Sequence, residues 1–188
     1  MALLKPLRLV KILGACLVII ALIVMPSGAS VKRAAAASTD IFLKIDGIDG
    51  ESTASGHKGE FEISSYSFGA SNAGSSAMGG GMGTGKVKMN DFHIIAKSGK
   101  ASPMLFQAVA SGKHFPKATI TAVSGGNTIT WDLQDVLITS YQATASNTET
   151  PTDEFSFNFT KIQTEYKSGS GSSDVIKAGW DVKANVKI

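Results

Sequence analysis

Apolar side chains recur at every second residue along much of the chain, and this period restricts its fold more than any other feature. Phe155, Phe157 and Phe159 show it most strictly, and Ile41 and Leu43 show it near the start of the regular region. A period of two places alternate side chains on one face of a β-strand. The chain is therefore predicted to be mainly β, with strands that each bury one face.

Turn-forming residues divide this pattern into separate strands. Phase slips at residues 90–91 and 134–135 indicate β-bulges, or at the first position a meeting of two strands. Residues 124–127 predict a hairpin turn, and residues 143–153 are predicted to form a polar loop. Seven or more strands point to a sandwich or a barrel. The predicted strands cover residues 39–48, 60–68, 86–97, 117–123, 128–141, 155–166 and 175–188.

One segment departs from this period and is predicted to be the only convincing helix after the N-terminal region. Ser102 is in position to cap it, and Pro103 occupies a first-turn site where its missing N–H costs nothing. Leu105 and Ala108 lie on one apolar stripe, and Gly112 supplies a left-handed end. A single short helix is thus expected to pack against a β protein.

Residues 1–37 have the organisation of a secretory signal peptide followed by a short linker. Three basic residues precede an apolar run at residues 12–25, which is short for a transmembrane span. Small residues permit cleavage after Ala29 or after Ala37, and the distance from the apolar run favours Ala29. The folded domain is predicted to span residues 38–188 and to be secreted or periplasmic in a bacterium. An uncleaved anchor is the alternative.

Cys16 is the only cysteine of the chain and follows Leu13, Gly14 and Ala15, a sequence that resembles a lipoprotein cleavage box. In a lipoprotein signal the apolar run precedes the cysteine, whereas here most of it follows. This order favours an unmodified residue of the signal over lipidation.

The composition after residue 37 excludes several function classes. The first 37 residues carry five of the 18 Lys and Arg side chains and none of the 15 Asp and Glu side chains, so the remainder is slightly negative and lacks Arg. Phosphate contacts and base recognition require clusters of Arg and Lys, so nucleic-acid binding is not expected. The remainder also lacks cysteine, which excludes disulfides, thiol catalysis and thiolate metal ligands.

Residues 69–85 are rich in glycine and have no apolar period, which predicts a long mobile loop. Its end, from Gly80 to Lys86, fits the G-x-x-x-x-G-K pattern of a phosphate-binding loop. Val87, however, replaces the Ser or Thr that would hold magnesium, and a strand rather than a helix N-terminus is expected to follow. A flexible loop is therefore a better interpretation than a nucleotide site.

The titratable residues predict neither a catalytic site nor a metal site. His57, His93 and His114 have no second ligand type at metal spacing, and no serine lies in a G-x-S-x-G nucleophile sequence. The acidic cluster at residues 46–51 does not match a calcium loop. Structural roles are expected for the histidines, and no cofactor is expected.

Several short phrases follow one another along the chain in a characteristic order. They are IFLKIDGI at 41–48, GHKG at 56–59, KMNDFH at 88–93, KASP at 100–103, ASGKHFPKA at 110–118, LQDVLITSY at 133–141, PTDE at 151–154, KIQTEY at 161–166 and AGWD at 178–181. In this order they resemble the haemolysin-coregulated protein (Hcp) family. The resemblance covers residues 40–183, and the order is far more specific than any single motif.

The resemblance implies a small β-barrel of two antiparallel sheets with one short α-helix packed on its side, which agrees with the strand pattern. It also implies a non-enzymatic subunit of the type VI secretion machine, a homo-oligomer whose six-membered rings stack into a tube that carries effectors. Exposed strand edges would then be contact surfaces. By position, the ring-to-ring contact is expected in the loop at residues 69–85, at Gly69, Met78, Met82 and Gly85. No membrane contact is expected once the signal is removed.

The N-terminal leader departs from this family pattern, because tube proteins are expected to assemble in the cytoplasm and to leave without a cleaved signal. The glycine content of residues 69–85 is also unusual for a contact segment. The alternative hypothesis is an exported Hcp-like barrel that serves as a binding or assembly module outside a type VI machine. An exported hydrolase is the least favoured hypothesis, because no nucleophile or metal set can be named.

Overall fold

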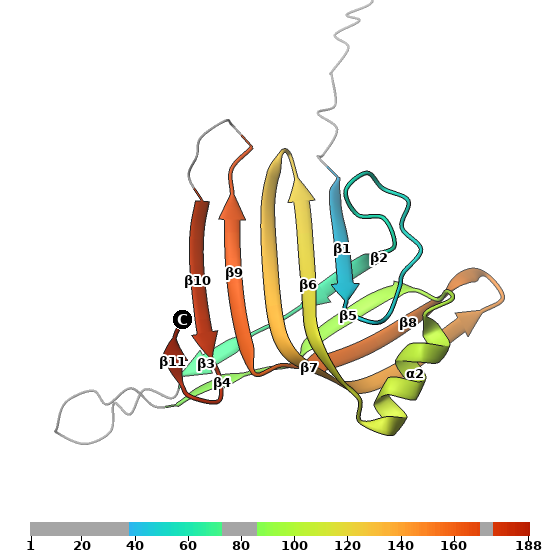
Figure 1. The fold of residues 1–188 in the computed structure, drawn as a ribbon. Helices are drawn as coiled ribbons and strands as arrows, with labels where there is room; N and C mark the ends of the chain where they lie inside the picture. Colours follow the sequence, from blue (N-terminus) through green and yellow to red (C-terminus); the bar gives the residue numbers. More distant parts are fainter. Residues whose placement is uncertain (1–37, 73–85, 170–174) are drawn as a thin grey trace, which may run out of the picture. The chain divides into compact units, whose positions relative to one another are not determined.

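A computed structural model describes residues 38–72, 86–169 and 175–188, and six of its strands close into a barrel (Figure 1). The barrel order is β7-β6-β1-β2-β5-β8, and it closes because β8 pairs with both β5 and β7. Every pairing is antiparallel. The six strands are β1 (Thr39–Ile45), β2 (Phe61–Ser67), β5 (Phe92–Lys97), β6 (His114–Ser124), β7 (Asn127–Ser146) and β8 (Glu149–Asn158).

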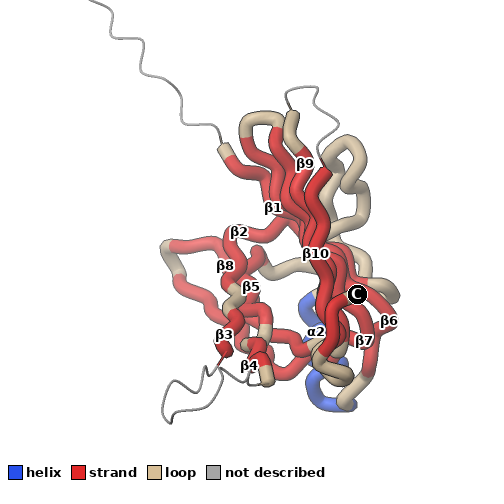
Figure 2. The backbone as a smooth tube through the Cα atoms, turned by 90° about the vertical axis from the view of Figure 1, so that its left-hand side faces the viewer, coloured by secondary structure: helices blue, strands red, loops and turns tan. Residues whose placement is uncertain are grey.

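Three further strands extend the same sheet from β7, and two form a separate ribbon. The extension runs β9 (Lys161–Lys167), β10 (Val175–Asp181) and β11 (Val186–Lys187), while β3 (Ala70–Asn72) pairs only with β4 (Val87–Met89). In Figure 2, β1, β9 and β10 belong to one wall, and β2, β5 and β8 lie on its other side. The structure therefore confirms the predicted mainly β barrel with antiparallel sheets.

The 20-residue strand β7 serves both the barrel and the extension by changing partners at Asp135. Before this residue β7 pairs with β9, and from Leu137 onward it pairs with β8. Asp135 has a φ of 52°, a left-handed conformation that Asp tolerates. The predicted bulge at residues 134–135 is therefore wrong, because the register between β7 and β6 is the same on both sides of Asp135. The break in the apolar pattern coincides instead with the change of partner from β9 to β8.

Aromatic rings fill the middle of the barrel. Phe92 is fully buried, and its ring stacks on Phe68 at a centroid distance of 4.4 Å and on Phe157 at 5.7 Å. Its edge meets Trp131 at 5.9 Å. The alternating phenylalanines that predicted a strand thus place their rings on the inner face of the barrel, where apolar area is removed from water.

Helix α2 (Ser102–Ser111) packs against β7 through the predicted stripe. Leu105 and Ala108 are buried, whereas Met104 is 44% exposed. Gly112 ends the helix with a φ of 63°, as predicted. The predicted capping role of Ser102 is wrong: Ala101 is the N-cap residue, and the Ser102 hydroxyl accepts a hydrogen bond from the Gly99 N–H outside the helix.

Two predicted loops contain strands. Residues 143–153 were expected to be a polar loop, but β7 continues to Ser146 and β8 begins at Glu149, with only a two-residue turn between them. Both strand ends are exposed, so they carry no apolar period although their backbones pair, with a register shift between Thr144 and Ser146. Likewise β3 occupies the first part of the loop expected at 69–85. The region at 86–97 is the predicted meeting of two strands, β4 and β5.

Candidate functional site

The predicted ring-contact loop can be located only at its base. The Gly69 carbonyl accepts a hydrogen bond from the Asn90 N–H at 2.9 Å, next to the β3–β4 ribbon. Met78, Met82 and Gly85 lie outside the described residues, as do the signal residues Cys16, Ala29 and Ala37. The contact role, the cleavage site and the boundary between residues 37 and 38 therefore stay predictions. Val87 opens a strand, so a helix N-terminus does not follow the phosphate-loop pattern.

Each of the three histidines is held by a neighbouring side chain in a different part of the barrel. The Nδ1 atoms lie 2.8 Å from Glu60 Oε2 for His57, 3.1 Å from Ser156 Oγ for His93, and 2.7 Å from Asp135 Oδ1 for His114. The His57 ring also stacks on Phe42 at 4.0 Å. Within the described ranges no three His, Cys, Asp or Glu side chains are grouped to hold a metal ion.

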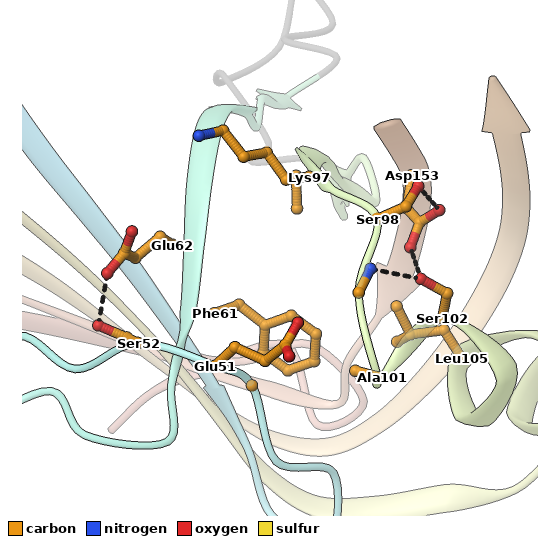
Figure 3. Close-up of a pocket in the computed structure, with 13 residues that line it drawn as sticks. Glu51, Ser52, Phe61, Glu62, Lys97, Ser98, Ala101, Ser102, Leu105 and Asp153 are labelled. Atoms are coloured by element: carbon orange, nitrogen blue, oxygen red, sulfur yellow. Dashed lines mark hydrogen bonds between the residues drawn. The ribbon is translucent and has the colours of Figure 1, made fainter. Parts of the chain in front are cut away.

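A pocket of about 210 Å³ lies beside the start of α2 (Figure 3). Phe61, Ala96 and Leu105 supply apolar lining. Glu62, which accepts a hydrogen bond from the Ser52 hydroxyl at 2.8 Å, lies on the opposite side of the pocket from Asp153. The full lining is Gly50, Glu51, Ser52, Phe61, Glu62, Ala96, Lys97, Ser98, Gly99, Ala101, Ser102, Leu105 and Asp153.

Asp153 is the centre of this pocket's polar wall, and it is only 2% exposed. Its carboxylate accepts hydrogen bonds from the Ser98 hydroxyl at 2.7 Å, from the Tyr141 hydroxyl at 3.0 Å and from the Ser102 hydroxyl. Burial raises the pKa of Tyr141, and the hydrogen bond to the Asp153 carboxylate and its charge add to this shift. Three donors thus satisfy a carboxylate that would be costly to bury alone.

This arrangement ties several elements of the fold together, and its lining residues do not include the hydrogen-bonded Ser–His pair that acyl transfer uses. The Ser102 hydroxyl already donates to a carboxylate, and no histidine is among the residues that line the pocket. The contacts instead tie the first turn of α2 to β8 and, through Ser98, to the end of β5. Sequence reasoning missed this centre because it assigned Asp153 to a loop, where a polar residue carries no signal.

A second pocket, of about 390 Å³, is mainly apolar and lies between the β3–β4 ribbon and strands β7, β9 and β10. We call it the indole cleft, because both tryptophans of the chain, Trp131 and Trp180, line it. Its remaining lining is Phe68, Ala70, Asn72, Val87, Met89, Ile162, Thr164, Ala178 and Gly179. The sequence offered no signal for it, since these residues come from five separate segments of the chain.

The apolar face continues beyond the cleft along one row of the sheet. Ile176, Tyr166, Ile129, Ala122 and Ile41 lie directly opposite one another on β10, β9, β7, β6 and β1, so their side chains share a face. Exposure along this apolar row rises from 37% at Ile129 to 67% at Ile176. A contiguous exposed apolar row of this kind is typical of a contact surface.

The opposite face of these strands is polar. Lys177 on β10 lies 2.6 Å from Glu165 on β9, and Lys117 lies 2.8 Å from Asp132. Burial alone would raise the pKa of Asp132, but hydrogen bonds from Lys117 and Thr119, together with the Lys117 charge, outweigh it and lower the pKa. The sheet extension is therefore amphipathic, with its apolar side continuous with the barrel interior.

Strand β10 also has an open edge. Within the described residues, β11 pairs with β10 only at Trp180 and Asp181, so the outer edge of β10 at residues 175–178 has no strand beside it. Unpaired backbone at a sheet edge is a site for pairing with another chain. No helix in the described part of the chain has the length and apolar character needed to span a bilayer.

The described residues thus form a closed antiparallel β-barrel that has one helix packed on its side, an open strand edge and an amphipathic sheet extension. The family model described as "Type VI secretion system effector, Hcp" matches residues 42–166. The chain therefore belongs to the Hcp family of the type VI secretion system. Members of this family are structural secreted proteins rather than enzymes.

Known relatives agree with this assignment. The chain is 34% identical over 160 residues to protein hcp1 of Pseudomonas aeruginosa, which covers 80% of this chain and 99% of the relative. The crystal structure of Hcp1 from Salmonella typhimurium matches with a TM-score of 0.68 and 30% identity, over 80% of this chain and 99% of that one. A type VI secretion system effector from Yersinia pestis matches with a TM-score of 0.65 and 29% identity, over 76% and 100%.

Proposed function

We propose that this chain is a tube subunit: six copies close into a ring, rings stack into a tube, and the tube carries secreted effectors. The observation that carries the proposal is the Hcp family match, which runs through the barrel from β1 to β9. The open edge of β10 and the apolar row beside it supply surfaces that self-association would cover. The role requires neither a cofactor nor a catalytic residue.

Ring closure would use the edge of β10. A neighbouring subunit that pairs with residues 175–178 would satisfy backbone groups that are otherwise left to water. The same neighbour would cover Ile176, which is 67% exposed on the apolar face. Closed cyclic assembly of identical subunits follows when such a heterologous contact has the right rotation.

Stacking of rings is proposed for the loop at residues 69–85, with Gly69, Met78, Met82 and Gly85 as contact residues. Support comes from its base. Gly69 and Asn90 anchor the β3–β4 ribbon, which pairs with no other described strand and so forms a sheet separate from that of the barrel. A loop that starts and ends on such a ribbon can reach a neighbour without disturbing the barrel.

The N-terminal sequence favours a second candidate function. Its basic start and apolar run at residues 12–25 predict a signal peptide with cleavage after Ala29 or Ala37. A secreted or periplasmic Hcp-like barrel would then act as a binding or assembly module outside a type VI machine. Mass spectrometry of the protein from the periplasm and the medium would identify the mature N-terminus and distinguish the two routes.

Light scattering and negative-stain microscopy of the purified protein test the ring directly. Six-membered rings are expected, and Ile176→Glu should shift them to monomers, because it places a charge on the proposed contact. The matched control is Phe106→Glu, which introduces the same charge at a residue that is 62% exposed on helix α2. A protein that remains monomeric at high concentration would contradict ring assembly and favour the exported module.

A further inference from the structure

We propose that the indole cleft is a binding site for a neutral, mainly apolar small molecule that carries one hydrogen-bond acceptor. This inference does not depend on ring assembly, because every residue of the site belongs to a single chain. It assigns the cleft between the β3–β4 ribbon and the sheet to a ligand, whereas the ring proposal uses the outer edge of β10 and Ile176.

The size and lining of the cleft suit such a ligand. Its volume of about 390 Å³ lies in the range of small-molecule sites, about 300–1,000 Å³. Phe68, Met89, Trp131 and Trp180 present aromatic and thioether surfaces, which bind apolar groups of varied shape. The floor is firm, because Ile162 is buried and the Phe68 ring is stacked on Phe92 at 4.4 Å.

The polar groups of the lining indicate what the ligand must carry. Trp131 already donates its indole N–H to the Tyr66 hydroxyl at 3.3 Å. The indole N–H of Trp180, in contrast, is buried and has no hydrogen-bond partner among the residues that the structure describes. Buried N–H groups in native proteins almost always have a partner, so an acceptor on a bound molecule would resolve this exception once the Trp180 ring adjusts to it. Asn72 and Thr164 add weaker polar contacts at the same site.

The charge of the ligand follows from the lining as well. None of the residues that line the cleft carries a charge, and none is a histidine. An ionised group buried there would lose its hydration without gaining a counter-ion. The cleft should therefore prefer an alcohol, ketone or ester over a carboxylate of the same chain length.

Tryptophan fluorescence of the purified full chain reads this site selectively, because the chain has two tryptophans and both line the cleft. The probes are 1-decanol and, as a charged match of equal length, decanoate at pH 8. A saturable fluorescence change is expected with 1-decanol. The affinity for decanoate should be lower by a factor of about ten or more. Equal binding of the two probes, or no saturable change with either, would overturn the proposal.

Two substitutions test the location and the polar contact. Ala178→Leu fills the cleft from β10 and should weaken 1-decanol binding about tenfold, whereas the same change at the exposed Ala143 on β7 should have no effect. Trp180→Phe keeps an aromatic wall without the N–H and should weaken binding several-fold, read through Trp131. If Ala178→Leu leaves binding unchanged, or if dilution of the protein alone reproduces the fluorescence change, the cleft is not the ligand site.

Discussion

The region of the barrel beside α2 and the sheet extension around β10 differ in how their polar and apolar groups are paired. Beside α2, the buried Asp153 carboxylate accepts three hydroxyl hydrogen bonds, and the Leu105 side chain is covered. Around β10, the Trp180 N–H has no partner among the described residues, and Ile176 lies open to solvent. The buried polar groups beside α2 are thus paired within one chain, although Phe106 on the outer face of the helix is exposed, whereas the β10 side leaves a buried N–H and an apolar row without partners.

This contrast distinguishes residues that stabilise the folded chain from residues that are available to bind a partner or a ligand. Satisfied buried groups contribute to the free energy of folding, and their removal should be costly. Exposed apolar groups and an open strand edge contribute little to that energy but are available to a partner or a ligand. Substitutions on the helix side should therefore change unfolding, and substitutions on the β10 side should change assembly or binding.

Matched truncations should show the largest difference between the two sides. Leu105→Ala should lower the free energy of unfolding by about 3 kcal/mol, because it removes buried methyl groups and leaves a cavity. Ile176→Ala, at an exposed position, should change it by less than about 0.5 kcal/mol. Urea unfolding of both variants measures the difference, and equal losses would contradict the contrast.

Removal of the buried carboxylate comes next in size. Asp153→Ala leaves the hydroxyls of Ser98, Ser102 and Tyr141 without their acceptor, so we expect a loss of about 2 kcal/mol in the free energy of unfolding. Glu149→Ala, at an exposed site at the start of β8, is the control and should stay within about 0.5 kcal/mol of the parent. A stable Asp153→Ala variant would show that the network is dispensable.

The two tryptophans allow a smaller and more specific comparison within the indole cleft. Trp131→Phe should cost about 1 kcal/mol, because it removes the hydrogen bond to Tyr66. Trp180→Phe should cost less, because it removes an N–H that has no partner. Thermal unfolding gives both values, and a larger loss for Trp180→Phe would mean that its N–H is satisfied in solution.

The smallest effect expected is a pH dependence confined to the helix side. The pKa of Tyr141 is raised in the folded chain, by burial and by Asp153, above its ordinary value of 10.0. The unfolded chain therefore loses this proton first, so the contribution to stability is complete below pH 10 and declines as pH rises toward the folded pKa. The free energy of unfolding, measured from pH 8 to pH 11, should fall less steeply with pH for Tyr141→Phe than for the parent. An unchanged slope would show that titration of Tyr141 does not contribute to the pH dependence.

Several features of the fold could be predicted from the sequence because they depend on local periodicity. The phenylalanines at 155, 157 and 159 and the stripe at Leu105 and Ala108 carry their burial pattern in their spacing. Gly112 ends the helix because a left-handed residue is needed there. The same local pattern gave a wrong prediction at Ser102. Its hydroxyl does not cap the helix but accepts a hydrogen bond from the Gly99 N–H and donates one to the Asp153 carboxylate.

The sequence by itself determined most of the strands, the helix at residues 102–111 and, through its ordered phrases, the Hcp family. Only the tertiary structure decided where β7 changes partners, that Asp153 is the buried centre of a hydroxyl network, and that Trp131 and Trp180 line one cleft. The physical reason is the separation along the sequence of the residues that interact. Periodicity and turn residues act between residues only a few positions apart. The change of partner, the network and the cleft arise from contacts between residues that closure of the barrel brings together.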